Sequence, residues 1–295
     1  MRLIQLSDIH VWRWAYRPSQ YFSKRTLGLL ELATGRAAKF RLERLDAVVE
    51  RVRSLDADHI LITGDLTTTA LPSEFRAARE ALAPLLGDPS RVTIIPGNHD
   101  RYTSGSVRRR KFEATFGAFA PQPEYPWLRP IGDGTAILGL DPTRSHISAQ
   151  GFLPAAQLDE ARSLLAEPST RPRRLIVACH YPLVAPPPYE EQLRAKRLAN
   201  DAGLRDWVAT LGPHLYCCGH VHAAWAFVPP GLPREICINS GAPLLRDPTG
   251  HNLPGFMQID LDGDVVSAIH HAWDGDGWLS VPKFVQPEFF STVPA

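Results

Sequence analysis

Five short apolar runs of this chain each end in a turn that carries Asp, His or Asn. The turns are Ser7-Asp8-Ile9-His10, Gly64-Asp65, Gly97-Asn98-His99-Asp100, Cys179-His180 and Gly219-His220-Val221-His222. In open α/β sheets, binding sites assemble at the edge formed by the carboxyl ends of the strands. We therefore expect these five turns to meet at one edge of the fold.

Short apolar runs alternate with helical patterns through the first two thirds of the chain. Runs typical of buried strands cover 3–6, 59–63, 92–96, 136–140, 175–179 and 215–218. Apolar residues recur at helical spacing over 41–55 and 73–86, and 154–166 and 190–210 are also predicted to be helical. Alternation of strand and helix favours an α/β fold with helices flanking sheet layers.

Beyond residue 214 the chain becomes mainly strand-like. Strands are expected at 224–228, 235–239, 256–261 and 265–270, and Asp262-Gly263 is a strong signal for a hairpin turn. We expect these strands to form an antiparallel or mixed sheet packed against the first. The sequence has no repeat and no linker-like stretch, so a single domain over 1–295 is predicted.

Composition sets limits on where the protein works and on its partners. The net charge is +1, so no global field attracts nucleic acid or an anionic membrane. Asp8 interrupts the apolar start, which argues against a signal peptide, and no apolar stretch is long enough to cross a bilayer. The four cysteines lie in apolar, strand-like segments and are expected to be buried, reduced thiols. Together these features predict a cytoplasmic protein.

The donor atoms of the five turns suit a pair of metal ions. Imidazole nitrogen favours transition metals and carboxylate or amide oxygen favours harder ions, so the mixed set indicates Mn, Fe, Zn, Ni or Co. Paired ions in phosphatases and nucleases lie about 3.5–4 Å apart. A carboxylate that bridges two ions can hold that spacing.

In order, Asp-x-His, Gly-Asp, Gly-Asn-His-Asp, His and Gly-His-x-His resemble the motifs of the calcineurin-like metallophosphoesterase superfamily. They extend from Asp8 to His222. The resemblance implies a four-layer αββα sandwich of two mixed β-sheets flanked by helices. It also implies roles for particular residues: Asp8, His10 and His222 at the first metal, Asp65 bridging both, and Asn98, His180 and His220 at the second.

The same resemblance implies hydrolysis of a small phosphate ester by a hydroxide that bridges two ions. His99 follows a ligand without being one, and would stabilise the phosphoryl group or protonate the leaving oxygen. Asp100 would orient His99. Length and the Gly-Asn-His-Asp-Arg segment most resemble bacterial class III cyclic-nucleotide and glycerophosphodiester phosphodiesterases, which favours a phosphodiester substrate. Lipid A-pathway pyrophosphatases, which belong to the same superfamily, usually carry Arg at the position of His99, and this difference counts against that reaction.

Several alternatives stay open. The same site would serve a phosphomonoesterase or a nucleotide pyrophosphatase, and a nuclease or a non-catalytic scaffold is less favoured. Arg101 and Tyr102 are candidate substrate contacts, and Asp141 is a weaker candidate for the pocket. The basic run 108–111 is interpreted as a solvated helix face opposite Phe112 and Phe116, with a rim that attracts anions as the alternative.

The segment 12–40 interrupts the expected alternation. It mixes aromatic and apolar residues with Arg and Lys and leaves directly from the Asp8/His10 turn. We interpret it as a helical, cap-like insert packed on the body or shaping the substrate pocket. Peripheral contact with a membrane is the less favoured alternative. The sequence does not predict the oligomeric state.

Overall fold

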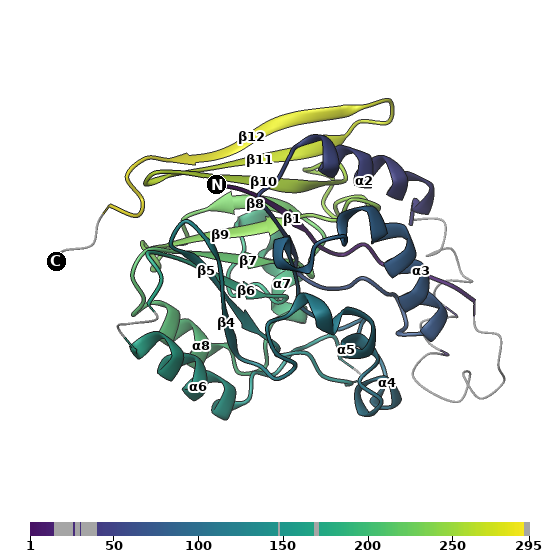
Figure 1. The fold of residues 1–295 in the computed structure, drawn as a ribbon, viewed down its shortest axis with the longest axis horizontal. Coiled ribbons are helices and arrows are strands. Elements are labelled where there is room, and N and C mark those ends of the chain that lie inside the picture. The colour runs from purple at the N-terminus through teal and green to yellow at the C-terminus, as the bar shows by residue number, and fades with distance from the viewer. Residues whose placement is uncertain (15–25, 27–29, 31–39, 147, 168–170, 292–295) are drawn as a thin grey trace.

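The computed structural model describes residues 1–14, 26, 30, 40–146, 148–167 and 171–291. Within this part, two mixed six-stranded sheets lie face to face, with helices on both outer faces (Figure 1). The predicted four-layer αββα arrangement is therefore confirmed. Most of the predicted cap-like insert at 12–40 lies outside the described residues.

The first sheet is organised around the first strand of the chain. β1 pairs in parallel with β2, which pairs in parallel with β3, and on its other side β1 pairs antiparallel with β10. In spatial order the strands are β12 (Trp278–Gln286), β11 (Val265–Trp273), β10 (Gly255–Asp262), β1 (Arg2–Leu6), β2 (His59–Ile62) and β3 (Val92–Ile94).

The second sheet has a parallel centre and antiparallel edges. β5, β6, β7 and β9 run parallel, while β4 and β8 are antiparallel to their neighbours. In spatial order they are β4 (Trp127–Gly132), β5 (Thr135–Leu140), β6 (Arg174–Cys179), β7 (His214–Cys218), β9 (Glu235–Ser240) and β8 (Ala224–Phe227). Parallel pairing brings the carboxyl ends of β6 and β7 to the same edge.

The expectation that the strands beyond residue 214 form a sheet of their own is wrong. β8 and β9 extend the second sheet, whereas β10, β11 and β12 extend the first. The sequence pattern does not separate these cases, because both sets of strands face the same core. Met257 and Ile259 of the first sheet pack in one cluster with Ile236 and Ile238 of the second.

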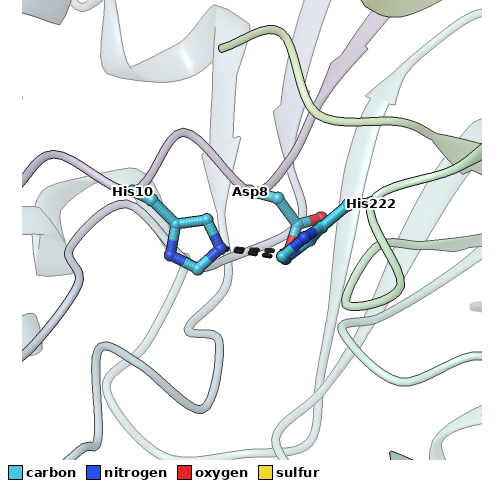
Figure 2. Close-up of side chains that lie close together, drawn as sticks. All are labelled: Asp8, His10 and His222. Atoms are coloured by element: carbon cyan, nitrogen blue, oxygen red, sulfur yellow. Dashed lines mark hydrogen bonds and ion pairs between the residues drawn. The ribbon is translucent and has the colours of Figure 1, made fainter. Parts of the chain in front are cut away.

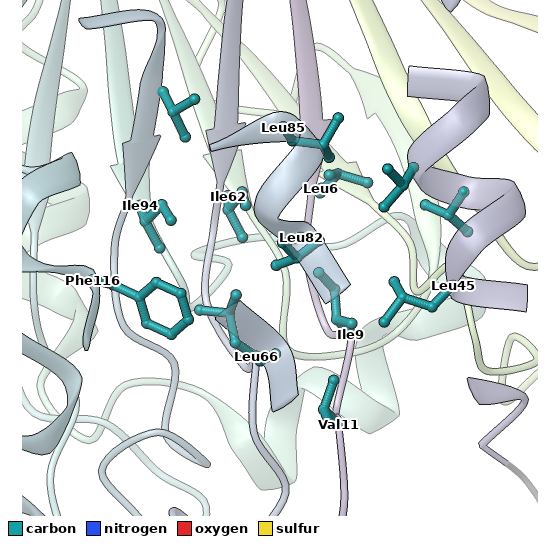
Figure 3. Close-up of a cluster of buried hydrophobic side chains, with 14 of the residues drawn as sticks. Leu6, Ile9, Val11, Leu45, Ile62, Leu66, Leu82, Leu85, Ile94 and Phe116 are labelled. Atoms are coloured by element: carbon teal, nitrogen blue, oxygen red, sulfur yellow. The ribbon is translucent and has the colours of Figure 1, made fainter. Parts of the chain in front are cut away.

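Helices cover both sheets, and apolar spacing decides which face they bury. α2 places Leu45, Val48, Val49 and Val52 against the first sheet, in the cluster of Figure 3. This face is covered by η4 (Leu42–Arg44), α2 (Leu45–Ser54), α3 (Pro72–Leu82), η5 (Ala83–Leu85), α5 (Lys111–Phe116) and η7 (Gly117–Phe119), with α4 (Ser104–Arg108) and η6 (Pro89–Arg91) near its edge.

The opposite face carries α6 (Ala155–Ala166), η8 (Pro187–Tyr189), α7 (Glu190–Lys196) and α8 (Asp201–Val208). The single helix predicted over 190–210 is wrong, because residues 197–200 separate α7 from α8. Tertiary contacts outweigh helix propensity there. Ala199 donates its backbone N–H to the Gly151 carbonyl, and Asn200 exchanges hydrogen bonds with the backbone of Leu153.

Two smaller expectations can also be compared with the structure. All four cysteines are buried and none forms a disulfide, as predicted. Among the described residues, no helix combines the length and apolar character that crossing a bilayer requires.

Candidate metal centre

The five predicted turns meet at one edge of the sandwich. Those after β1, β2 and β3 carry Asp8, His10, Asp65 and Asn98, and those after β6 and β7 carry His180, His220 and His222. Three sets of candidate donor atoms lie close together: Asp8, His10 and His222; Asp65, His180 and His220; and His10, Asp65 and His99. Both sheets therefore contribute to one cluster.

Backbone conformation is unusual at this cluster. Asp8, His10, Asp65, His220 and His222 all have φ between 53° and 74°, in the left-handed region. Side chains other than Gly adopt this region at a cost, and such residues concentrate at functional sites. The strained turns are what direct these five side chains toward one another.

The first group joins the two sheets. His10 Nε2 and His222 Nε2 lie 3.1 Å apart, and Asp8 Oδ1 lies 3.5 Å from His222 Nε2 and 3.8 Å from His10 Nε2 (Figure 2). Asp8 also accepts the backbone N–H of His220 at both carboxylate oxygens. One side chain thus holds the Gly-His-x-His turn against the end of β1.

Asp65 lies between the first group and the other two members of the second, His180 and His220. Its Oδ2 atom is 3.7 Å from His10 Nε2 and 3.4 Å from His180 Nε2, while Oδ1 accepts the backbone N–H of His99 at 2.7 Å. His180 Nε2 is in turn 3.2 Å from Asn98 Oδ1. A single carboxylate oxygen therefore faces donors of both groups, which is the placement that a bridging ligand needs.

Backbone carbonyls orient two of the imidazoles. His180 Nδ1 lies 2.7 Å from the carbonyl oxygen of Thr63, and His220 Nε2 lies 3.0 Å from that of Lys196. A ring nitrogen that donates to a carbonyl leaves the other nitrogen as the ligand atom. His180 would thus bind through Nε2 and His220 through Nδ1. Sequence reasoning missed Thr63 and Lys196, because a carbonyl carries no residue-type signal.

Burial sets the electrostatics of the cluster. Burial is the largest single influence on Asp65 and opposes its ionisation, but the charges of His180, His99 and His10 and a hydrogen bond from His180 together outweigh it and hold the pKa of Asp65 well below its usual value. Burial likewise lowers the pKa of His180, yet Asp65 raises it to about 9. Burial raises the pKa of Asp8 to about 7. The protein groups alone thus pair a carboxylate with a protonated imidazole, whose proton a metal ion would displace.

The residues present fit a pair of ions. Two donors each about 2.1 Å from one ion are separated by roughly 3.0–3.4 Å at octahedral or tetrahedral angles. The distances of 3.1 Å between His10 and His222 and 3.4 Å between Asp65 and His180 agree with this spacing. The set mixes imidazole nitrogen with carboxylate and amide oxygen, as expected for transition metals.

His99 lies at the same edge, but its ring is held differently than expected. Its Nδ1 lies 2.6 Å from the Thr68 carbonyl oxygen, and its ring stacks on Tyr102 with centroids 5.4 Å apart. The expectation that Asp100 orients the His99 ring is not supported by the contacts of Asp100. That carboxylate instead accepts the backbone N–H groups of Leu66, Thr67 and Gly97 and the hydroxyl of Thr67, joining two turns.

Arg101 is buried behind the site. Its guanidinium pairs with Glu113 at 2.6 Å and with Asp141 at 2.9 Å. Asp141, the weaker candidate for the pocket, thus forms an ion pair with Arg101. That Arg101 or Tyr102 contacts the substrate stays a prediction. Arg108, Arg109 and Arg110 are exposed, while Phe112 and Phe116 are buried, so the expectation of a solvated run opposite these rings is confirmed for the three arginines. The expectation of a single helix face is wrong, because the run spans the break between α4 and α5, and Lys111 is half-buried and donates to the Ala70 carbonyl.

Comparisons with known proteins identify the family and the fold. The sequence model of the calcineurin-like phosphoesterase family matches residues 1–224. A dimetal phosphatase from Danio rerio has a similar structure, with a TM-score of 0.60 and 12% identity over 96% of this chain and 99% of that one. A purple acid phosphatase from yellow lupin (Lupinus luteus) seeds gives 0.59 and 12%, over 99% of this chain and 55% of that one.

At such identities the structural likeness shows the fold alone. No curated protein matches the sequence. The family expected from the five motifs is confirmed by the family match, whereas the narrower resemblance to class III phosphodiesterases stays a prediction.

Proposed function

The chain belongs to the calcineurin-like phosphoesterase family, and we propose that it is a dinuclear-metal enzyme that hydrolyses a phosphodiester. The observation that carries this proposal is the convergence of five left-handed residues from both sheets: Asp8, His10, Asp65, His220 and His222. Packing alone does not require this strain, so a function for the converging side chains accounts for it.

The ligand roles in this proposal follow the contacts. Asp8, His10 and His222 would hold the first ion, and Asn98, His180 and His220 the second. Asp65 would bridge them, since its Oδ2 faces both His10 and His180. The candidate ions are Mn, Fe, Zn, Ni and Co, because the donor set suits each of them.

When bound, the two ions would neutralise phosphate oxygens and lower the pKa of water toward neutrality. The residues of the chain have separate tasks. Asp65 keeps its negative charge between the two groups, where it would help to hold two cations close together. His99 would donate its Nε2 proton to the leaving oxygen when the ring is a doubly protonated imidazolium, because its Nδ1–H faces the Thr68 carbonyl and only Nε2 is left for the substrate.

The preference for a diester rests on the resemblance of the Gly-Asn-His-Asp-Arg segment to bacterial phosphodiesterases. His99 is compatible with that preference, because an alkoxide is a poor leaving group and a proton from a positioned imidazole assists its departure. This assistance depends on the leaving alcohol and serves a monoester and a diester of the same alcohol alike.

The experiment is a side-by-side assay of the Mn-loaded protein with bis-p-nitrophenyl phosphate, p-nitrophenyl phosphate and cyclic AMP. We expect higher kcat/KM for a diester than for the monoester, and loss of all turnover in His222→Ala. His251→Ala serves as the matched control, because His251 is exposed and its ring contacts the Thr249 hydroxyl.

Two results would contradict the proposal. Faster turnover of the monoester than of both diesters would replace the phosphodiesterase by a phosphomonoesterase on the same site. Absence of turnover of any ester, with fewer than two metal ions per chain, would favour a non-catalytic scaffold.

A further inference from the structure

A cavity of about 520 Å³ lies behind one wall of the metal centre. It is lined by Arg41, Arg44, Leu244, Leu245, Arg246, Asp247 and Pro248, and we call it the arginine pocket. The ring of Phe40, the residue before Arg41, lies 5.5 Å from the ring of His10. Phe40 and Leu245 pack in one cluster, so the same short segments form the wall of the metal centre and the pocket.

The positive charges of the arginine pocket are poorly compensated. Arg41 lies 3.4 Å from Glu43 in a surface pair whose side chains are 55% and 64% exposed, and such pairs contribute little. In the described part of the chain, no acidic side chain forms an ion pair with Arg44 or Arg246. With respect to the described residues, the guanidinium donors of half-buried Arg44 and exposed Arg246 are therefore open to a ligand from solvent.

Asp247 lines the pocket but is engaged elsewhere. Its Oδ1 accepts the backbone N–H and the hydroxyl of Thr249, and its Oδ2 accepts the Tyr189 hydroxyl and both nitrogens of Asn252. Both carboxylate oxygens are thus occupied by the adjoining loop. Asp247 is ionised and lines the pocket, but it forms no ion pair with Arg41, Arg44 or Arg246 among the described contacts.

The three arginines also act on one another. Burial lowers the pKa of Arg44, and the positive charges of Arg41 and Arg246 lower it further, while Glu43 raises it. Like charges gathered in a partly enclosed space repel, and a bound anion relieves that repulsion. Guanidinium groups match the oxygens of phosphate with parallel hydrogen bonds.

We propose that the arginine pocket binds a phosphate-type anion, separate from the phosphate at the metal centre. The anion is either a second phosphate group of the substrate or free phosphate. The binding itself does not depend on turnover, whereas a role in recognising substrate rests on the proposed phosphodiesterase function.

The test counts phosphate ions bound per chain by equilibrium dialysis of the Mn-loaded protein against radiolabelled inorganic phosphate. We expect two per chain in the wild type and one in Arg44→Ala and in Arg246→Ala, with chelation of the metals removing the remaining one. Arg76→Ala is the matched control, since Arg76 is an exposed arginine on α3. The Arg76→Ala variant should still bind two phosphate ions per chain.

Failure of this inference differs from failure of the proposed function. If both pocket variants bind as much phosphate as the wild type, the arginine pocket is not an anion site. If instead the metal centre binds no phosphate, the wild type binds one ion that chelation leaves in place and Arg44→Ala removes.

A kinetic comparison identifies the source of the anion. The substrates are bis-p-nitrophenyl phosphate and a p-nitrophenyl diester whose other alcohol carries a terminal phosphate. If the substrate supplies the anion, Arg44→Ala raises KM by about tenfold or more for the phosphorylated diester alone. If the anion is free phosphate, Arg44→Ala changes the KM values of the two diesters alike, while the number of phosphate ions bound per chain still falls by one.

Discussion

The Nδ1 atom of His99 lies 2.6 Å from the carbonyl oxygen of Thr68. This contact fixes the tautomer when the imidazole is neutral, and stacking on Tyr102 fixes the ring plane. The turn after β3 and the turn after β2 are thereby joined at the edge where the ligand-type residues converge. The orientation of His99 therefore depends on a backbone carbonyl and an aromatic neighbour.

Replacing His99 by Ala should leave metal binding intact and remove proton donation. We expect about two metal ions per chain and a loss of kcat of about 10²–10⁴-fold with alkyl diesters, whose leaving groups need the proton. The loss should be smaller with p-nitrophenolate as the leaving group. Metal analysis and kinetics on paired substrates check this. An equal loss for both leaving groups would contradict the assigned role.

Replacing Asn98 by Ala should remove one ligand of the second ion without touching the first. Asn98 Oδ1 lies 3.2 Å from His180 Nε2, whereas Asp8, His10 and His222 form their own group. We expect occupancy to fall from about two ions to about one per chain, as measured by elemental analysis after dialysis. His251→Ala controls for the loss of an exposed polar side chain. Full occupancy of both sites in Asn98→Ala would show that the ligand assignment is wrong.

Much of the site could be predicted because strand ends are local features. An apolar run followed by Asp, His or Asn is visible in the sequence, and parallel pairing then brings the ends together. The contacts that orient the imidazoles of the site are long-range and were not predictable. The carbonyl oxygens of Thr63, Thr68 and Lys196 contact imidazoles far along the chain, and any residue type can supply a carbonyl.

The fold was predictable where burial imposes a pattern. β4 and β12 were not predicted, because each contains a proline and β12 is largely exposed at the edge of its sheet. The break between α7 and α8 was missed for another reason. Leu198 is fully buried and belongs to the apolar pattern, yet the two residues after it are held by long-range contacts: the Ala199 N–H donates to Gly151, and the Asn200 side chain bonds the backbone of Leu153.

His59 should make the protein sensitive to mild acid. Burial, together with Arg129 and Arg91, lowers the pKa of His59 from 6.5 to about 3. Above pH 6.5, His59 is neutral in both the folded and the unfolded chain and has no effect on the free energy of unfolding. Below it, the unfolded chain takes up a proton that the folded chain refuses, so stability falls with pH until about pH 3. The cost by pH 5 is about 2 kcal/mol.

The measurement is denaturant unfolding at pH 7 and pH 5 for the wild type and His59→Gln. Gln can keep the contact that His59 Nε2 makes with the Thr93 hydroxyl at 2.8 Å, but it does not titrate. We expect the drop in unfolding free energy between the two pH values to be smaller in the variant by about 2 kcal/mol. An unchanged drop would mean that His59 becomes protonated in the folded protein.

Gly97 should be essential to the position of the bridging residue. A Cβ atom at this position would overlap Asp65 Oδ1 and the backbone nitrogen of Asp65, and would lie 2.7 Å from Asp65 Cγ. Gly97→Ala must therefore displace the carboxylate that faces both ligand groups. We expect a loss of about 1–3 kcal/mol in unfolding free energy, as for other overpacked sites, together with fewer metal ions per chain.

Gly87→Ala is the matched control, because a Cβ atom there would meet nothing within 4 Å. It should change stability by less than about 0.5 kcal/mol and leave metal content unaltered. Thermal unfolding and elemental analysis of the two variants separate backbone effects of the substitution from displacement of Asp65. If Gly97→Ala kept both ions and full activity, the turn after β3 would have to move away from Asp65 without cost. In that case the close approach of Gly97 would not be what fixes the bridging carboxylate.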